Sequence, residues 1–104
     1  MKFINPYLSI EYKIRMLQRF ILVQSYIYYY CDTNIVSDRI YDMNAQQLIK
    51  LMNNNPKVKT EFSYAFKGFE SGTGFDLYKK LKRNHKTLIS RDGDLAIKIA
   101  NSKR

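Results

Sequence analysis

The sequence predicts a mainly α-helical domain, in which an antiparallel helical hairpin is followed by a basic C-terminal half. Apolar residues recur at helical spacing through two long segments, and each segment ends at turn-forming residues. The hydrophobic share of 45% is ordinary for a folded protein, and 104 residues are enough for one modest core. We therefore expect a single domain over residues 1–104, with the hairpin at about 12–56 and the basic half at 57–104.

The first predicted helix runs from Asn5-Pro6 to about residue 31. Asn5 is a suitable N-cap with Pro6 in the first turn, and Ser9 is a second candidate cap. Two adjacent apolar stripes follow the helical period: Ile10, Ile14, Leu17, Ile21, Tyr28 and Cys31, and Met16, Phe20, Val23, Ile27 and Tyr30. Such a wide apolar face predicts a helix that packs on more than one side.

The second predicted helix begins after the break at Asp32-Thr33-Asn34. Ser37 is the expected N-cap, and Asp38 in the first turn complements the helix dipole. The expected buried residues are Ile40, Met43, Leu48 and Leu51. The asparagines and proline of "NNNP" (53–56) end this helix, and the short connection favours antiparallel packing.

The second half of the chain has shorter elements. Apolar and charged residues alternate over 57–67, which predicts one short extended segment or a strap across the hairpin. "GFESGTG" (68–74) is a turn-rich loop, and residues 75–88 fit one or two short basic helices. We expect "RDGD" (91–94) to break the chain again and Asp94 to cap a last short helix.

Composition excludes several classes of protein. With one cysteine, Cys31, no internal disulfide can form, and with one histidine, His85, no zinc site can be assembled, so we expect no metal. The longest apolar stretch, about a dozen residues, is too short to span a bilayer, and no secretory signal is visible. We expect a cytoplasmic protein with no membrane partner.

The stretch "YIYYYCDTNIVSDRIYD" (26–42) carries the candidate binding residues. Asp38, Tyr41 and Asp42 share one face at the start of the second helix, and Tyr28 and Asp32 are four residues apart at the end of the first. A short loop between the helices would join them into an aromatic slot rimmed by carboxylates. Such a slot suits a flat cationic or amide-bearing ring.

This pattern resembles the N-terminal helical subdomain of bacterial NAD-dependent DNA ligases. The matching features are the double tyrosine, Asp32, the "SD-x-x-YD" opening of the next helix and its "LIKLMNNNP" continuation, over roughly residues 12–56. In that family the subdomain closes over the nicotinamide mononucleotide (NMN) half of NAD. The resemblance places the ligand contacts at Tyr28, Tyr29, Asp38, Tyr41 and Asp42, and Tyr29 stands where many members have histidine.

The resemblance also predicts a protein without ligase activity. Adenylation in that family needs the lysine of a K-x-D-G motif, but Ser90 stands at that place before Asp92-Gly93. The chain also lacks the length for the other ligase domains, and we find no catalytic arrangement around its single histidine. In size and basic character it resembles short ligase-related bacteriophage proteins, which implies a role in viral DNA metabolism within the host cytoplasm.

Charge suggests a second kind of partner. The formal charge is +9, and residues 56–104 hold twelve basic and five acidic side chains, against six and four in residues 1–55. The basic residues Lys79, Lys80, Lys82, Arg83 and Lys86 lie within "YKKLKRNHK" and are candidate contacts for DNA or RNA phosphates. The alternative is a solvated basic face that contacts no nucleic acid.

Three alternatives remain open for the tyrosine-rich stretch itself. The tyrosines can bind a nucleotide, or they can fill a core while Ser37 and Asp38 cap a helix. In the third alternative the surface binds a host protein, as in a small viral modulator of a host enzyme.

Overall fold

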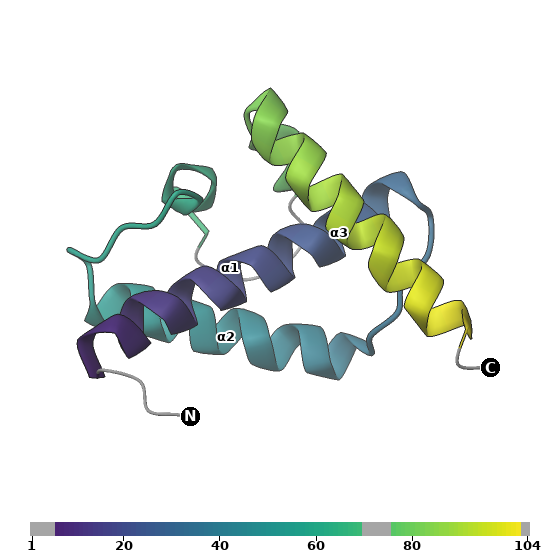
Figure 1. The fold of residues 1–104 in the computed structure, drawn as a ribbon. Helices are drawn as coiled ribbons and strands as arrows, with labels where there is room; N and C mark the ends of the chain where they lie inside the picture. Colours follow the sequence, from purple (N-terminus) through teal and green to yellow (C-terminus); the bar gives the residue numbers. More distant parts are fainter. Residues whose placement is uncertain (1–5, 70–75, 103–104) are drawn as a thin grey trace.

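The computed structural model describes residues 6–69 and 76–102, which form helices and loops and include no strand. The α-helices are α1 (Pro6–Tyr30), α2 (Asp38–Asn54) and α3 (Arg83–Ser102), and the 3-10 helices are η1 (Ser63–Phe66) and η2 (Tyr78–Lys80). α1 and α2 lie side by side as an antiparallel pair, and α3 crosses the C-terminal half of α1 (Figure 1). The predictions of a mainly α fold and of a helical hairpin are confirmed.

α1 is the central helix, because it contacts both α2 and α3. Five consecutive residues, 21–25, are buried, which is possible only if neighbours cover several sides of the helix. Ile14, Gln18 and Ile27 extend the buried surface toward both ends. The wide apolar face predicted the packing of this helix on more than one side. Its predicted cap, Asn5, lies outside the described residues.

The hairpin connection is defined at both ends. Asp32 follows α1 in the left-handed backbone conformation (φ 53°), which Asp tolerates better than most residues, and the Thr33 N–H donates back to the Ile27 carbonyl at 3.4 Å. At the other end the Ser37 hydroxyl accepts a hydrogen bond from the Ile40 N–H at 3.2 Å. The prediction of Ser37 as the N-cap of α2 is thus confirmed, with Asp38 in the first turn.

The buried face of α2 differs from the predicted one. Ala45 and Leu48 are fully buried, whereas Ile40 and Met43 are 45% and 60% exposed. The core side of α2 carries residues 41, 45, 48, 49, 51 and 52, and does not include Ile40 or Met43. The prediction is correct for Leu48 and for Leu51, which is partly buried against the core, and wrong for Ile40 and Met43. It gave weight to large apolar side chains and passed over the small Ala45, which is fully buried.

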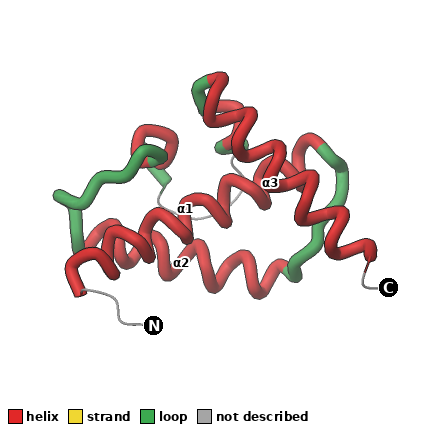
Figure 2. The backbone as a smooth tube through the Cα atoms, in the orientation of Figure 1, coloured by secondary structure: helices red, strands yellow, loops and turns green. Residues whose placement is uncertain are grey.

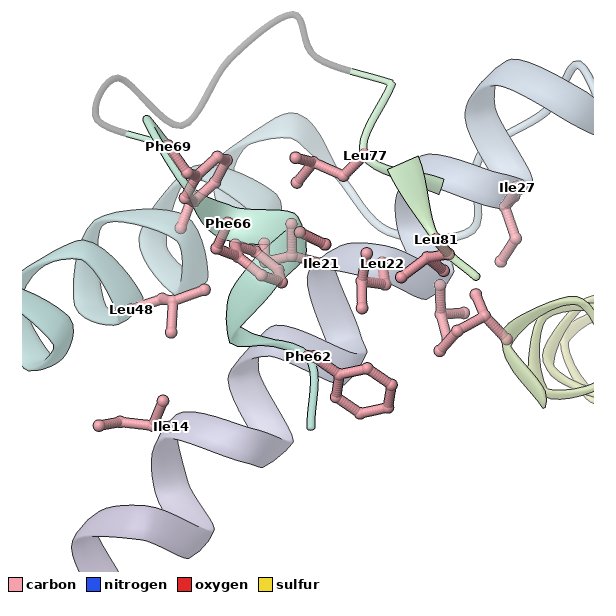
Figure 3. Close-up of a cluster of buried hydrophobic side chains, with 14 residues drawn as sticks. Ile14, Ile21, Leu22, Ile27, Leu48, Phe62, Phe66, Phe69, Leu77 and Leu81 are labelled. Carbon is pink, nitrogen blue, oxygen red and sulfur yellow. The ribbon is translucent and has the colours of Figure 1, made fainter. Parts of the chain in front are cut away.

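Residues 55–69, the crossing segment, return from α2 to α1 through turns and η1. The predicted extended segment is therefore wrong, although the segment does cross the hairpin as a strap. Phe62, Phe66 and Phe69 point into the core beside Ile21 and Leu22 (Figure 3). The burial of three aromatic rings stabilises this segment without a strand partner.

Polar contacts also fasten the crossing segment to α1. The amide of Gln18, which is fully buried, donates to the Ser63 hydroxyl at 3.4 Å and accepts a hydrogen bond from the Thr60 hydroxyl. At the surface Arg15 and Glu61 form a two-point ion pair, at 2.8 and 3.1 Å. The Arg15 guanidinium holds the pKa of the Glu61 carboxyl below its usual value.

α3 is one uninterrupted helix, so the predicted break at residues 91–94 and the cap at Asp94 are both wrong (Figure 2). Gly93 is buried against α1, where a Cβ would lie 2.5 Å from Cδ2 of Tyr26. Asp92 forms an ion pair with Arg19 at 2.6 Å, and Asp94 accepts a hydrogen bond from the Tyr26 hydroxyl at 2.7 Å. The residues that suggested a turn therefore dock α3 on α1.

Candidate functional site

The end of the hairpin presents two tyrosine rings from α1. Tyr28 is 59% exposed and Tyr29 is 43% exposed, and their rings meet edge to face with centroids 4.9 Å apart. They precede the turn at Asp32, which is itself exposed. Because both rings are exposed, the pair is an accessible stacking surface at the end of the hairpin.

α2 contributes the other half of this surface. Tyr41 is half-buried, and burial, the neighbouring Tyr29 and the charge of Asp42 all raise the pKa of its phenol. Asp38 and Asp42 are both exposed and lie one helical turn apart on α2. The rings of Tyr28 and Tyr29 are in contact, and Tyr29 and Asp42 both act electrostatically on the Tyr41 phenol. Asp38 lies on the same face of α2 as Asp42.

We call these five residues, Tyr28, Tyr29, Asp38, Tyr41 and Asp42, the hairpin-end site. Chemically the site offers aromatic faces, phenol hydroxyls that donate and accept hydrogen bonds, and two carboxylates that face water. It suits a planar ring that carries positive charge or an amide. Its exposed rings and carboxylates can hold such a ligand by stacking and by hydrogen bonding.

Tyr26 and Tyr30 of the same stretch have a structural role, which depends on contacts with residues distant in the sequence. Tyr26 and Tyr30 stack with centroids 6.1 Å apart and both contact Tyr78 of η2. The Tyr30 hydroxyl donates to Asp76 at 2.5 Å, which raises the pKa of Tyr30 to about 12, and the bond to Asp94 raises the pKa of Tyr26. Tyr30 belongs to a predicted apolar stripe of α1, but it is 49% exposed because its hydroxyl bonds to Asp76 at the surface.

The predicted nucleic-acid contacts lie on η2 and at the start of α3. Lys79, Lys80, Lys82 and Arg83 are exposed, and Lys86 is half-buried with its ammonium 5.9 Å from the centre of the Tyr78 ring. The first turn of α3 contains no acidic residue. Cations at a helix N-terminus oppose the helix dipole, so this charge arrangement does not stabilise the helix. The exposed cations are available to an external anion.

Two further residues in this region were missed by the sequence analysis. The Tyr64 hydroxyl accepts a hydrogen bond from the Lys82 N–H at 2.9 Å and contacts Nδ1 of His85 at 2.8 Å. The two rings stack with centroids 5.7 Å apart. Tyr64 alternates with lysines in residues 57–67, and this alternation was interpreted as evidence for an extended segment and not for an aromatic residue within a basic surface.

Comparisons with protein-family models, curated proteins and solved structures find no match for this chain. Among residues 6–69 and 76–102, no group of three or more potential metal ligands comes together, and no helix is long and apolar enough to cross a membrane. The candidate sites are therefore defined by their geometry and by the motif in the sequence.

Proposed function

We propose that this protein is a non-catalytic accessory factor of DNA metabolism, viral in origin, that binds the NMN half of NAD at the hairpin-end site. One observation carries the proposal: the exposed ring pair of Tyr28 and Tyr29 ends α1, and Tyr29 lies within electrostatic range of Tyr41 at the start of α2. These are the positions at which the resemblance to NAD-dependent DNA ligases places the ligand contacts. The nicotinamide ring, flat and cationic in NAD, matches this chemistry.

The environment of Asp92-Gly93 supports a role in binding without adenylation. Ser90 occupies the place of the nucleophilic lysine, Asp92 is paired with Arg19, and Gly93 is packed against Tyr26. Each of these groups has a partner within the fold. A separate enzyme would have to carry out any transfer of the adenylate.

Isothermal titration calorimetry with NMN, NAD and AMP tests the proposal. We expect NMN and NAD to bind and AMP to give no heat, because only the nicotinamide half is recognised. Tyr29→Ala and Asp42→Asn, both at exposed positions, should each weaken NMN binding about tenfold, since each removes one interaction worth ~1–2 kcal/mol. Glu11→Gln, an exposed site elsewhere on α1, is the matched control. Absence of heat at millimolar NMN contradicts the proposal.

A second candidate function, nucleic-acid binding, is favoured by the cations around the start of α3. Residues 77–88 hold Lys79, Lys80, Lys82, Arg83 and Lys86 and no acidic side chain. If all five contact phosphates, affinity for duplex DNA falls about 500-fold between 50 and 200 mM salt. Fluorescence anisotropy with a labelled duplex measures this slope. No binding at 20 mM salt, or binding unchanged when the five are replaced by Ala, contradicts this function.

A further inference from the structure

A hollow lies between the end of α2 and the crossing segment. It has a volume of about 460 Å³ and is lined by Tyr64, Lys59 and Lys67, with Asn55, Met52 and Phe66 among the residues of its wall. It thus combines an aromatic ring, two cations, an amide and apolar surface. This is the composition of a small-ligand site in which a few polar groups surround an apolar floor.

The ring of Tyr64 is held in place and is still accessible. Its hydroxyl is fixed by the Lys82 N–H and by His85, yet 39% of the residue is exposed. His85 stacks on the ring at an interplanar angle of 25°, and in turn packs edge to face on the buried Phe62. A ring held in this way loses little conformational entropy when a ligand stacks on it.

Positive charge surrounds this ring. The ammonium of Lys82 lies 5.3 Å from the centre of the Tyr64 ring, so Tyr64 joins the wall of the hollow to the basic residues before α3. Together, residues 55–69 and 77–88 carry eight Lys or Arg side chains and one acidic residue, Glu61. Glu61 forms an ion pair with Arg15 at 2.8 Å, which compensates its negative charge.

We propose that Tyr64, Lys59, Lys67 and Lys82 form a binding site for single-stranded nucleic acid, in which a base stacks on Tyr64 and the flanking phosphates contact the lysines. A rigid aromatic ring between cations is the arrangement by which single strands are bound without sequence preference. In a duplex the bases are already stacked on their neighbours, so the hollow selects the single strand. This site deepens the second candidate function and rests on it.

Fluorescence anisotropy with a labelled oligothymidylate and with a duplex of equal length tests the site. Tyr64→Leu removes the ring and should weaken single-strand binding about 5- to 100-fold while leaving duplex affinity unchanged. Tyr64→Phe keeps the ring and should retain most of the affinity. Circular dichroism establishes whether each variant is folded.

A second variant tests the site without touching the anchored ring. Lys59→Ala with Lys67→Ala, both exposed, should lower the single-strand affinity and reduce the salt slope by about 1–2. Lys13→Ala with Lys98→Ala removes the same charge from exposed positions elsewhere and should leave that slope nearly unchanged. Photocrosslinking with 5-iodouracil should label the tryptic peptide of residues 60–67, which contains Tyr64.

The outcomes separate the two proposals. Loss of single-strand binding on Tyr64→Leu, with duplex binding retained, supports the site. A different result overturns the Tyr64 site and keeps the second candidate function. In that result the wild type and Tyr64→Leu bind the single strand equally well, and binding is lost on replacing Lys79, Lys80, Lys82, Arg83 and Lys86. No binding of either nucleic acid at low salt overturns both.

Discussion

The close contact between Gly93 and Tyr26 predicts an unusual effect of a glycine-to-alanine change in a helix. Alanine in place of glycine normally stabilises a helix by about 1 kcal/mol. Here the added Cβ would lie 2.5 and 2.9 Å from Cδ2 and Cε2 of Tyr26, well inside van der Waals contact. The ring cannot easily move away, because it packs against Tyr30 and Tyr78 and its hydroxyl bonds to Asp94.

The change in the free energy of unfolding on Gly93→Ala has two destabilising contributions and one stabilising contribution. Overpacking of this kind costs about 1–3 kcal/mol, and loss of the Tyr26–Asp94 hydrogen bond costs about 1 kcal/mol more. Subtracting the helix propensity of alanine, about 1 kcal/mol, leaves a net destabilisation of about 1–3 kcal/mol for Gly93→Ala. This corresponds to a fall in Tm of ~4–8 °C for each kcal/mol in a domain of this size.

Urea denaturation followed by circular dichroism measures this change. A double-mutant cycle separates the clash from helix propensity, because in the Tyr26→Ala background the same Gly93→Ala change should be neutral or stabilising. Thr87→Ala, at an exposed position on α3, reports the ordinary propensity gain. If Gly93→Ala stabilises the wild type by about 1 kcal/mol, the close packing of α3 on α1 at this point is refuted.

Three further predictions concern stability. Ser37→Ala should destabilise the protein by ~0.5–2 kcal/mol in urea denaturation, because it removes the acceptor for the Ile40 N–H. Ser37→Asp should retain the cap, and equal loss of stability in both variants would refute a capping role. Thr60→Val should destabilise by ~1–3 kcal/mol, because the carbonyl oxygen of the buried Gln18 loses its donor, and a neutral result would show that this hydrogen bond is unimportant. The pKa of Tyr30 is raised to about 12 in the folded state by Asp76, so between pH 10 and 12 the folded protein holds a proton that the unfolded chain has lost. The contribution of Tyr30 to the free energy of unfolding is complete below pH 10 and is lost as pH rises through about 12. The free energy of unfolding should therefore fall over this range, and fall less steeply in Tyr30→Phe. A wild-type profile that stays level to pH 12 would contradict the Tyr30–Asp76 contact.

The sequence predicted those elements whose signals are local. The Ser37 cap, the turn at Asp32 and most of the apolar stripes of α1 depend on residues within one or two helical turns, and the structure contains them. Met16, Tyr28 and Tyr30 are the stripe residues that prove to be exposed. It was harder to predict which tyrosines are structural and which belong to the hairpin-end site. Tyr26 and Tyr30 lie on one face of α1, and Tyr28 and Tyr29 lie on others. Their separation depends on Asp76 and Asp94, which are distant in sequence.

The errors have a common physical cause. "RDGD" reads as a turn because Gly and Asp are weak helix formers, but Arg19 compensates Asp92, Tyr26 binds Asp94, and Gly93 permits the helices to approach. Tertiary packing overrides local propensity in the same way in the crossing segment, where the aromatic residues are buried without a strand. Contacts between residues so far apart cannot be read from spacing in one sequence.

Titration of ¹⁵N-labelled protein with NMN, followed by heteronuclear NMR, tests the proposed function most directly. The proposal predicts saturable shifts of backbone amides at Tyr28, Tyr29, Tyr41 and Asp42, with residues 77–88 unaffected. Asp42→Asn should shift the midpoint to about tenfold higher NMN. If millimolar NMN leaves the amides of residues 28–42 in place, or moves residues elsewhere instead, the hairpin end is not a nucleotide site and the proposed function is wrong.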